Sequence, residues 1–414
     1  MRARQLTGSL PSVLVLCLAA FMIARPPWWS FNYAAPVALA AIVLSGRLPR
    51  LRAADTLALL TGGWAYASLL WTDRTDLAAP AAYRYVSVCL LFVAVRHVLR
   101  GRRDLLLIGW TYLAGCAVVS IEVILGARTQ GPVLVFDQRY GIEGINVNFT
   151  AYTLAAGVVL SLVLAVVAST GPTLLRFGPL ALTLLLGSAV LLNGSRGATI
   201  GMLAGLTVVL FALLLPRLTV LTVGMLAAAL IVLVPFGMAP ERQLLWFDSL
   251  YGRPTGDISG RLAIWPYALT TWSEAPLTGS GAGVFINTNP FEMGPHNLLL
   301  TVGNDLGLVG VLLYFGTIAV ALIAAARTSR AGLLLIGAFT ATMTPIWLTG
   351  QWETSLAMWL VLALVTVSPE VNNPRRGRHA RANHRASGLL QSPLFTVSPT
   401  GVPSLGHTGR RRAF

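Results

Sequence analysis

The sequence HNLLLTVGNDLGLVGVLLYFGTIAVALIAA, residues 296–325, decides the fold class of this chain. Asp305 is the only acidic or strongly basic residue in it. The hydrocarbon core of a bilayer is about 30 Å thick and needs roughly 20 consecutive apolar residues of helix. This run therefore predicts a membrane-spanning helix. Because it is longer than one straight crossing needs, we expect a break or a re-entrant turn near Gly307 or Gly310.

The whole chain repeats this pattern. It has 414 residues, of which 55% are hydrophobic and only 11% are charged, whereas a soluble domain has about 25% charged residues. No pattern of short alternating strands indicates a β-barrel. We predict an all-α polytopic membrane protein with about 12 transmembrane helices, although eleven or thirteen also fit. The apolar runs lie at approximately 10–24, 31–46, 53–71, 81–98, 104–125, 148–169, 174–193, 197–215, 218–238, 296–325, 331–348 and 353–368.

The basic residues predict the orientation. All 30 are arginine, and 21 of them fall on one side of the membrane if the N-terminus is cytoplasmic. Positive charge favours the cytoplasmic side, so both termini are expected in the cytoplasm. The first run lacks a clear small-residue cleavage site, so it is expected to be a retained helix rather than a removed signal peptide. The chain is then a multi-pass protein of the cell inner (cytoplasmic) membrane. Its large extracytoplasmic loop, 239–295, lies between helices 9 and 10 and contains RLAIWPYALTTW (261–272), whose spacing predicts an amphipathic helix.

The C-terminal segment has a different composition. Residues 371–414 are rich in arginine, serine and proline and have no apolar period, which predicts a disordered cytoplasmic tail. The tail is either a solvated topology anchor or a segment that contacts anionic membrane lipids. No nucleic-acid partner is indicated, because no folded pattern accompanies the charge. The remaining residues, 1–370, form the predicted transmembrane domain.

His296 is the only one of five histidines expected on the outer face. Its side chain is the only one there whose ordinary pKa lies close to neutrality. Pro295 before it suits the first turn of a helix, and the Asn297 amide at the same position can bond a ligand. The alternative is an interfacial histidine that caps a helix or bonds a lipid headgroup.

Two arginines are expected on the same face. Arg196 lies in LLNGSRGATIGMLAG (191–205), where Ser195 is placed to cap the following span. That helix points its positive N-terminal end outward, which favours an anion. Arg261 lies in DISGRLAIW (257–265). A guanidinium group suits phosphate oxygens, but each arginine could instead extend toward lipid headgroups.

The stretch PLTGSGAGVF (276–285) has three closely spaced glycines. It does not follow a strand of a βαβ unit, so we predict a tight turn beside His296 rather than a nucleotide site. Asp305 lies about 13.5 Å beyond His296 along an unbroken helix and marks a polar interior or a function. The three cysteines, Cys17, Cys89 and Cys116, lie within apolar runs. No grouping has metal-ligand spacing, so neither a metal nor another cofactor is expected.

Four segments in this order resemble the O-antigen ligase and polymerase family: SRGATIGMLAG (195–205), RLAIW (261–265), PLTGSGAGVF (276–285) and PHNLLLTVGNDLGLVGVLLY (295–314). The motif-bearing core is 190–315. The resemblance implies a membrane glycosyltransferase of the GT-C type. Such an enzyme takes a glycan from an undecaprenyl-diphosphate carrier on the outer leaflet and passes it to an acceptor hydroxyl, in ligation or polymerisation of envelope polysaccharide.

The resemblance also implies residue roles. Arg196 and Arg261 would hold the diphosphate, with Ser195 and Asn297 beside them, and His296 would act as a general base or as a cationic partner of phosphate. The transfer would be metal-independent and would invert the anomeric carbon, with a glycan, lipid or protein as acceptor. Two alternatives remain open: a transporter or flippase of lipid-linked saccharides, and an assembly partner without a site of its own.

Overall fold

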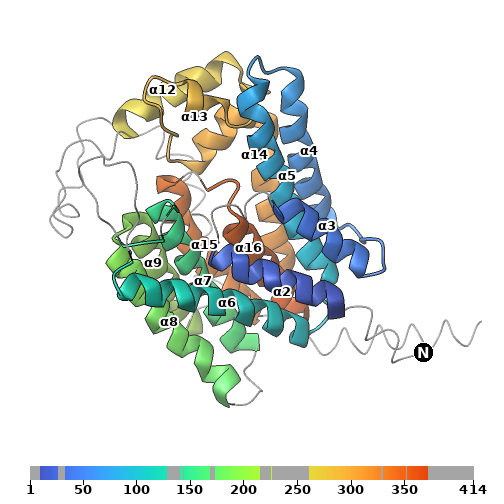
Figure 1. The fold of residues 1–414 in the computed structure, drawn as a ribbon, viewed down its shortest axis with the longest axis vertical. Helices are drawn as coiled ribbons and strands as arrows, with labels where there is room; N and C mark the ends of the chain where they lie inside the picture. The colour runs from blue at the N-terminus through green and yellow to red at the C-terminus, as the bar shows by residue number, and fades with distance from the viewer. Residues whose placement is uncertain are drawn as a thin grey trace, which may run out of the picture. The chain divides into compact units, whose positions relative to one another are not determined.

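The computed structural model describes residues 10–26, 33–127, 140–142, 144–167, 173–214, 225, 261–327, 330–350 and 352–371. These residues form a bundle of helices (Figure 1). The helices, with one 3-10 turn, are α2 (Leu10–Ala24), α3 (Ala34–Leu44), α4 (Ala53–Ala67), η2 (Ser68–Leu70), α5 (Thr75–Val98), α6 (Arg102–Ile124), α7 (Val147–Val167), α8 (Thr173–Asn193), α9 (Arg196–Leu214), α12 (Arg261–Glu274), α13 (Val284–Thr288), α14 (Leu298–Ala326), α15 (Arg330–Thr349) and α16 (Leu356–Val371).

Eleven of the twelve predicted apolar runs correspond to helices in the structure. The run 218–238 apart from residue 225, the loop residues 239–260 and the tail 372–414 lie outside the described residues. Within the described part, five helices are long and apolar enough to cross a membrane, and five further apolar helices are shorter. The prediction of a helical membrane protein is confirmed. The loop sequence 261–272 also forms the expected helix, α12.

The core of the bundle is organised around α16. The residues of this helix from 356 to 369 are buried on every side, as expected for a helix that is apolar all round. The ring of Trp359 meets the rings of Phe92 on α5 and Tyr314 on α14 edge-on, with centroids 5.6 Å and 5.4 Å apart. Edge-to-face packing suits the aromatic quadrupole. Trp359 therefore joins three helices at the centre of the protein.

The helices α9 and α15 pack closely through glycines. Gly197, Gly201 and Gly205 follow one another at four-residue intervals, and a Cβ atom at any of them would overlap Thr349 or Thr342 of α15. Small residues at this spacing let two helix backbones approach each other in a membrane. The glycines of the 195–205 motif therefore hold the start of α9 against the end of α15.

A buried ion pair lies at the end of the bundle that the arginine distribution assigns to the cytoplasm. Arg96 Nε lies 2.6 Å from Asp55 Oδ1, and both side chains are 6% exposed. Arg96 also donates to Thr366 Oγ1 at 2.9 Å, so the pair ties α4, α5 and α16 together. A buried pair needs such extra hydrogen bonds because both charges have lost their water.

The helix α14 breaks at Gly307, as the length of its apolar run predicts. Gly307 has φ 64° and ψ −168°, far from helical values, in a region that only glycine enters readily. A break inside a membrane exposes backbone groups that lipid cannot satisfy. These groups must find partners in the protein.

The glycine-containing segment 276–281 supplies most of those partners. Ser280 N and Gly281 N donate to the carbonyls of 304 and 305 at 2.8 Å and 3.0 Å, and Trp64 Nε1 donates to the carbonyl of 306 at 2.9 Å. Beyond the break, the N–H groups of 308 and 309 donate to the carbonyls of 276 and 277 at 2.8 Å and 3.3 Å. The predicted tight turn is confirmed, but its partner is the break in α14.

We predict that Gly307→Ala destabilises the protein strongly. The new Cβ would overlap the backbone of Leu277, and a non-glycine residue with this backbone conformation costs about 1–3 kcal/mol before any overlap. Gly316→Ala is the matched control in the same helix, because its Cβ would lie 3.8 Å from Leu57 Cδ1. Thermal unfolding of the purified proteins in detergent should show a clear fall in Tm for the first variant alone. Equal Tm values would contradict the close approach at Gly307.

Candidate functional site

A small apolar cluster fixes the segment that precedes α14. Ile264, Trp265 and Ala268 of α12 pack with Phe285 of α13 and Leu300 of α14. The indole Nε1 of Trp265 donates to the carbonyl of Pro295 at 2.7 Å. Figure 1 shows α12 and α13 together at one end of the bundle, beside α14. The RLAIW motif therefore positions the backbone that carries His296.

His296 has an unusual backbone conformation. Its φ is 49°, in the left-handed region that few non-glycine residues adopt. Such residues persist where the surrounding structure holds them, often at functional sites. The prediction that Pro295 and His296 form the first helical turn is wrong, because α14 begins at Leu298 and Asn297 is its N-cap. A capping side chain at position 297 satisfies a free N–H at the start of α14 and leaves His296 outside the helix.

Asn297 is almost fully buried, with 1% of its surface exposed. Its Oδ1 accepts a hydrogen bond from Leu300 N at 3.1 Å. Its Nδ2 has no hydrogen-bond partner among the described residues, and an unsatisfied buried donor is unfavourable. The Oδ1 atom of Asn297 therefore caps α14, and its Nδ2 group can donate a hydrogen bond to a ligand.

Ser195 and Arg196 lie at the start of α9. Ser195 is 2% exposed, and its carbonyl accepts from Thr199 N at 2.9 Å. Arg196 is the first residue of α9 and Arg261 is the first residue of α12; the side chain of Arg261 lies outside the described residues. Arg196 therefore occupies a helix N-terminus, where the helix dipole favours anions. The residues before Arg261 lie outside the described part of the chain. The capping role of Ser195 stays a prediction.

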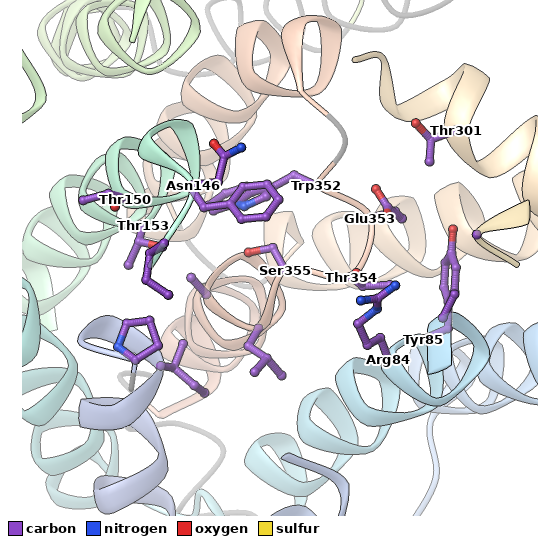
Figure 2. A pocket seen from close by; sticks show the side chains of 18 of the residues that line it. Arg84, Tyr85, Asn146, Thr150, Thr153, Thr301, Trp352, Glu353, Thr354 and Ser355 are labelled. Carbon is purple, nitrogen blue, oxygen red and sulfur yellow. The ribbon is translucent and has the colours of Figure 1, made fainter. Parts of the chain in front are cut away.

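A cavity of about 420 Å³ lies among α2, α5, α7, α14 and the connection between α15 and α16. Its volume is within the usual range for small-ligand sites, about 300–1,000 Å³. Figure 2 shows its polar wall, with side chains from α5, α7, α14 and the connection. The labelled polar residues are Arg84, Tyr85, Asn146, Thr150, Thr153, Thr301, Glu353, Thr354 and Ser355.

The broken helix contributes Asp305 to this cavity. Asp305 is 4% exposed, and the hydroxyl of Tyr85 donates to its Oδ2 at 3.3 Å. It lies one turn beyond Thr301, so both residues face the cavity from the same side of α14. Asp305 therefore lies in the lining of the cavity, and both interpretations of this residue, a polar interior and a function, stay predictions.

The connection between α15 and α16 contributes Glu353. Its backbone carbonyl accepts from the Tyr314 hydroxyl and from Trp359 Nε1, both at 3.0 Å. Burial raises the pKa of the Glu353 carboxyl above its ordinary value, while its backbone N–H and the charge of Arg84 act in the opposite direction. Its Oε2 is buried and has no hydrogen-bond partner among the described residues.

Residues adjacent in sequence to His296 and Arg196 lie in or near the lining of this cavity. Pro295, which is bonded to His296, lines the cavity. Gly197, next to Arg196, packs against Thr349, a few residues before the connection that carries Glu353. His296, Arg196 and Arg261 themselves do not line the cavity.

Arg84 and Glu353 are the site candidates that the sequence interpretation omitted. Each stands near the end of an apolar run that the predicted topology assigns to the outer face. A charged residue is ordinary at such a position. The signal that could have found them is that both fall on the same face as Arg196 and His296.

The family comparison bears on this end of the bundle. A family model described as O-antigen ligase matches residues 181–315. The match runs from α8 into α14 and contains Ser195, Arg196, Arg261, His296 and Asn297. The resemblance to O-antigen ligases is therefore confirmed for this part of the chain. Arg84 and Glu353 lie outside the matched residues.

Two other comparisons add little. A search of curated proteins gives no match. A chain from a solved structure, in work on the structural coordination of polymerization and crosslinking by a peptidoglycan synthase complex, is similar over 77% of this chain and 98% of its own length. Its sequence identity is 16% and its TM-score is 0.39. This degree of similarity does not establish a shared fold.

We predict that Asn297→Ser leaves stability nearly unchanged, whereas Asn297→Ala lowers it by about 0.5–2 kcal/mol. Serine keeps an oxygen that can cap the helix, and alanine does not. The lost Nδ2 has no partner among the described residues, so its removal breaks no contact that the structure shows. Thermal unfolding of both variants measures the difference. An equal fall in Tm for serine and alanine would mean that Nδ2 has a structural partner.

Proposed function

We propose that this protein transfers a glycan from an undecaprenyl-diphosphate-linked donor to an acceptor hydroxyl on the outer face of the cytoplasmic membrane. The reaction would ligate or polymerise a cell-envelope polysaccharide. The observation that carries the proposal is the O-antigen ligase match, because it spans the arginines and the histidine that the sequence motifs single out. The cavity beside Pro295 supports it, since several polar side chains converge there in a mostly apolar lining, as in small-ligand sites generally.

The proposed mechanism divides the work among three side chains. Arg196 and Arg261 hold the donor diphosphate, with Ser195 and Asn297 contributing hydrogen bonds, and stabilise the negative charge that develops on the leaving diphosphate. His296 removes the proton of the acceptor hydroxyl as that oxygen attacks the anomeric carbon. Direct displacement inverts this carbon, and no covalent sugar intermediate forms. The transfer needs no metal.

The proposed topology has twelve spans and cytoplasmic termini, so that the active site faces the outside. Two features of the bundle support it. The buried Asp55–Arg96 pair lies at the ends of α4 and α5 that this topology assigns to the cytoplasm. The cavity is lined by residues near the opposite ends of these and other helices, including Arg84, Pro295 and Glu353.

A transporter or flippase of lipid-linked saccharides is the second candidate. A transporter binds its substrate near the membrane midplane, commonly at discontinuous helices, and the break in α14 is a feature of this kind. Transfer and transport differ in their product: only transfer forms a new glycosidic bond. An assay of glycan movement across liposomes separates the two.

We predict that His296→Ala lowers turnover by about 10²–10⁴-fold while donor binding is retained, because a general base contributes about this factor. The assay is transfer of a labelled glycan from synthetic undecaprenyl diphosphate by the purified protein, with a panel of acceptors and a chelator present. His97→Ala is the control, since His97 contacts Ser45 at 2.9 Å at the other end of the bundle. Wild-type rates for His296→Ala would exclude the proposed base.

We predict that Arg196→Ala weakens donor binding and lowers turnover, because the variant loses a charged diphosphate contact that strengthens as the leaving group departs. A loss of about 10²–10³-fold in turnover is expected for one such group. Binding of undecaprenyl diphosphate and transfer rates are measured on the same preparations. Unchanged values for both would remove Arg196 from the site. Donor binding that depends on Arg196, without product from any acceptor in the wild type, would favour the carrier.

A further inference from the structure

The wall of the cavity that faces α14 contains charged groups to which the mechanism gives no role. Arg84 projects from α5, and Glu353 lies in the connection between α15 and α16 (Figure 2). Both residues lie outside the stretch that matches the O-antigen ligase model. They are also separate from the diphosphate-binding positions 195–196 and 261. The question is which chemical group this wall accommodates.

Glu353 offers a hydrogen-bond acceptor that the protein does not use. Its Oε2 is buried and lacks a partner among the described residues. Its main chain cannot move away easily, because Tyr314 and Trp359 hold its carbonyl. A buried, unsatisfied carboxylate oxygen is unfavourable. A ligand hydroxyl that donates to Oε2 would remove this penalty.

Arg84 offers hydrogen-bond donors at the same place. Its side chain is exposed and lines the cavity, and it forms no hydrogen bond or ion pair with the described residues. Its charge acts electrostatically on the carboxyls of both Glu353 and Asp305. The guanidinium group carries five N–H donors in a fixed plane. The wall therefore presents donors and acceptors side by side.

The remaining lining is suited to a ring with both polar and apolar faces. Trp352 is 3% exposed and lines the cavity next to Glu353. Its ring is fixed by Tyr152, with centroids 5.1 Å apart. Thr301, Thr354 and Ser355 add side-chain hydroxyls that can donate or accept. A sugar ring combines C–H faces with hydroxyls that both donate and accept, so it matches this lining.

We propose that Arg84, Glu353 and Trp352 form a subsite for an uncharged sugar ring, the one bonded to the diphosphate of the donor. This inference rests on the proposed function. The lining disfavours an acidic ring, because the carboxyl groups of Glu353 and Asp305 already lie with Arg84 in the same cavity, and the carboxylate of a uronic acid would be a third acidic group there. In contrast, the diphosphate-binding positions contribute two arginines and no carboxylate.

The position of the wall fits this assignment. Pro295 lines the cavity and is bonded to His296, the proposed base. The sugar that carries the reacting carbon must lie between the diphosphate-binding groups and the base. A ring held by Arg84 and Glu353 would occupy the cavity beside Pro295, within reach of the segment that carries His296.

The test compares binding of two kinds of carrier to the full-length protein in nanodiscs. The probes are undecaprenyl diphosphate alone and undecaprenyl diphosphate carrying glucose, N-acetylglucosamine or glucuronic acid, measured by native mass spectrometry and thermal shift. The variants are Arg84→Gln, Arg84→Lys and Glu353→Gln. The controls are Arg74→Gln, which removes an exposed arginine just before α5 that pairs with Asp76 at 3.1 Å, and Glu274→Gln, which removes an exposed carboxylate.

We expect the wild type to bind at least one neutral-sugar carrier about tenfold or more tightly than the bare carrier, which is the scale of one charged hydrogen bond. Arg84→Gln and Glu353→Gln should lose this preference and keep the affinity for the bare carrier. Arg84→Lys, which keeps the charge and loses the planar fork, should lose part of it. The two controls should match the wild type.

Several results would contradict the proposed sugar subsite without contradicting the proposed function. These are equal binding of sugar-linked and bare carriers by the wild type, an unchanged preference in Arg84→Gln and Glu353→Gln, or an Arg84-dependent preference for glucuronic acid. Failure of the proposed function looks different: a sugar preference that depends on Arg84 and Glu353, but no product with any acceptor. In that case the subsite stands and belongs to a carrier.

Discussion

The break in α14 is the feature on which the site depends. A helix interrupted inside a membrane leaves backbone groups that lipid cannot satisfy, and segment 276–281 satisfies those on both sides of Gly307. This pairing fixes the segment that follows α12 against the middle of the bundle. The Trp265 bond to Pro295 then fixes the start of α14. One constraint on backbone hydrogen bonding thus determines where His296 and Asp305 lie.

The parts of this arrangement that could be predicted from the sequence are the local ones. The length of the run 296–325 predicted a break or a re-entrant turn near Gly307 or Gly310, and the glycines of 276–285 predicted a turn. The sequence did not indicate that the turn closes the break, because that pairing joins residues 24 or 32 positions apart. It does so through backbone atoms, which carry no residue-type signal. The first turn of α14 was predicted wrongly because Pro295 favours a helix start, whereas the Asn297 cap overrides it.

The site residues also differ in whether the sequence alone could identify them. Arg196, Arg261 and His296 stand in segments whose pattern is distinctive, so motif spacing singled them out. Arg84 and Glu353 have no such pattern around them. Their partners in the cavity come from helices distant in the sequence, and only the packing of α5, α7, α14 and α16 brings them together. The run 218–238 stays a predicted span, since all of it except residue 225 lies outside the described residues.

Two sets of charges in the bundle show why the cavity is more than a packing feature. Asp55 and Arg96 are 6% exposed and 2.6 Å apart, and Thr366 takes a further N–H of the arginine. This pair is closed, as a buried ion pair must be to avoid a large desolvation penalty. Arg84 and Glu353 face a cavity instead, and Oε2 of the Glu353 carboxyl has no hydrogen-bond partner among the described residues. Because the same fold closes one pair and leaves the other open, the open pair is better explained by a ligand than by stability.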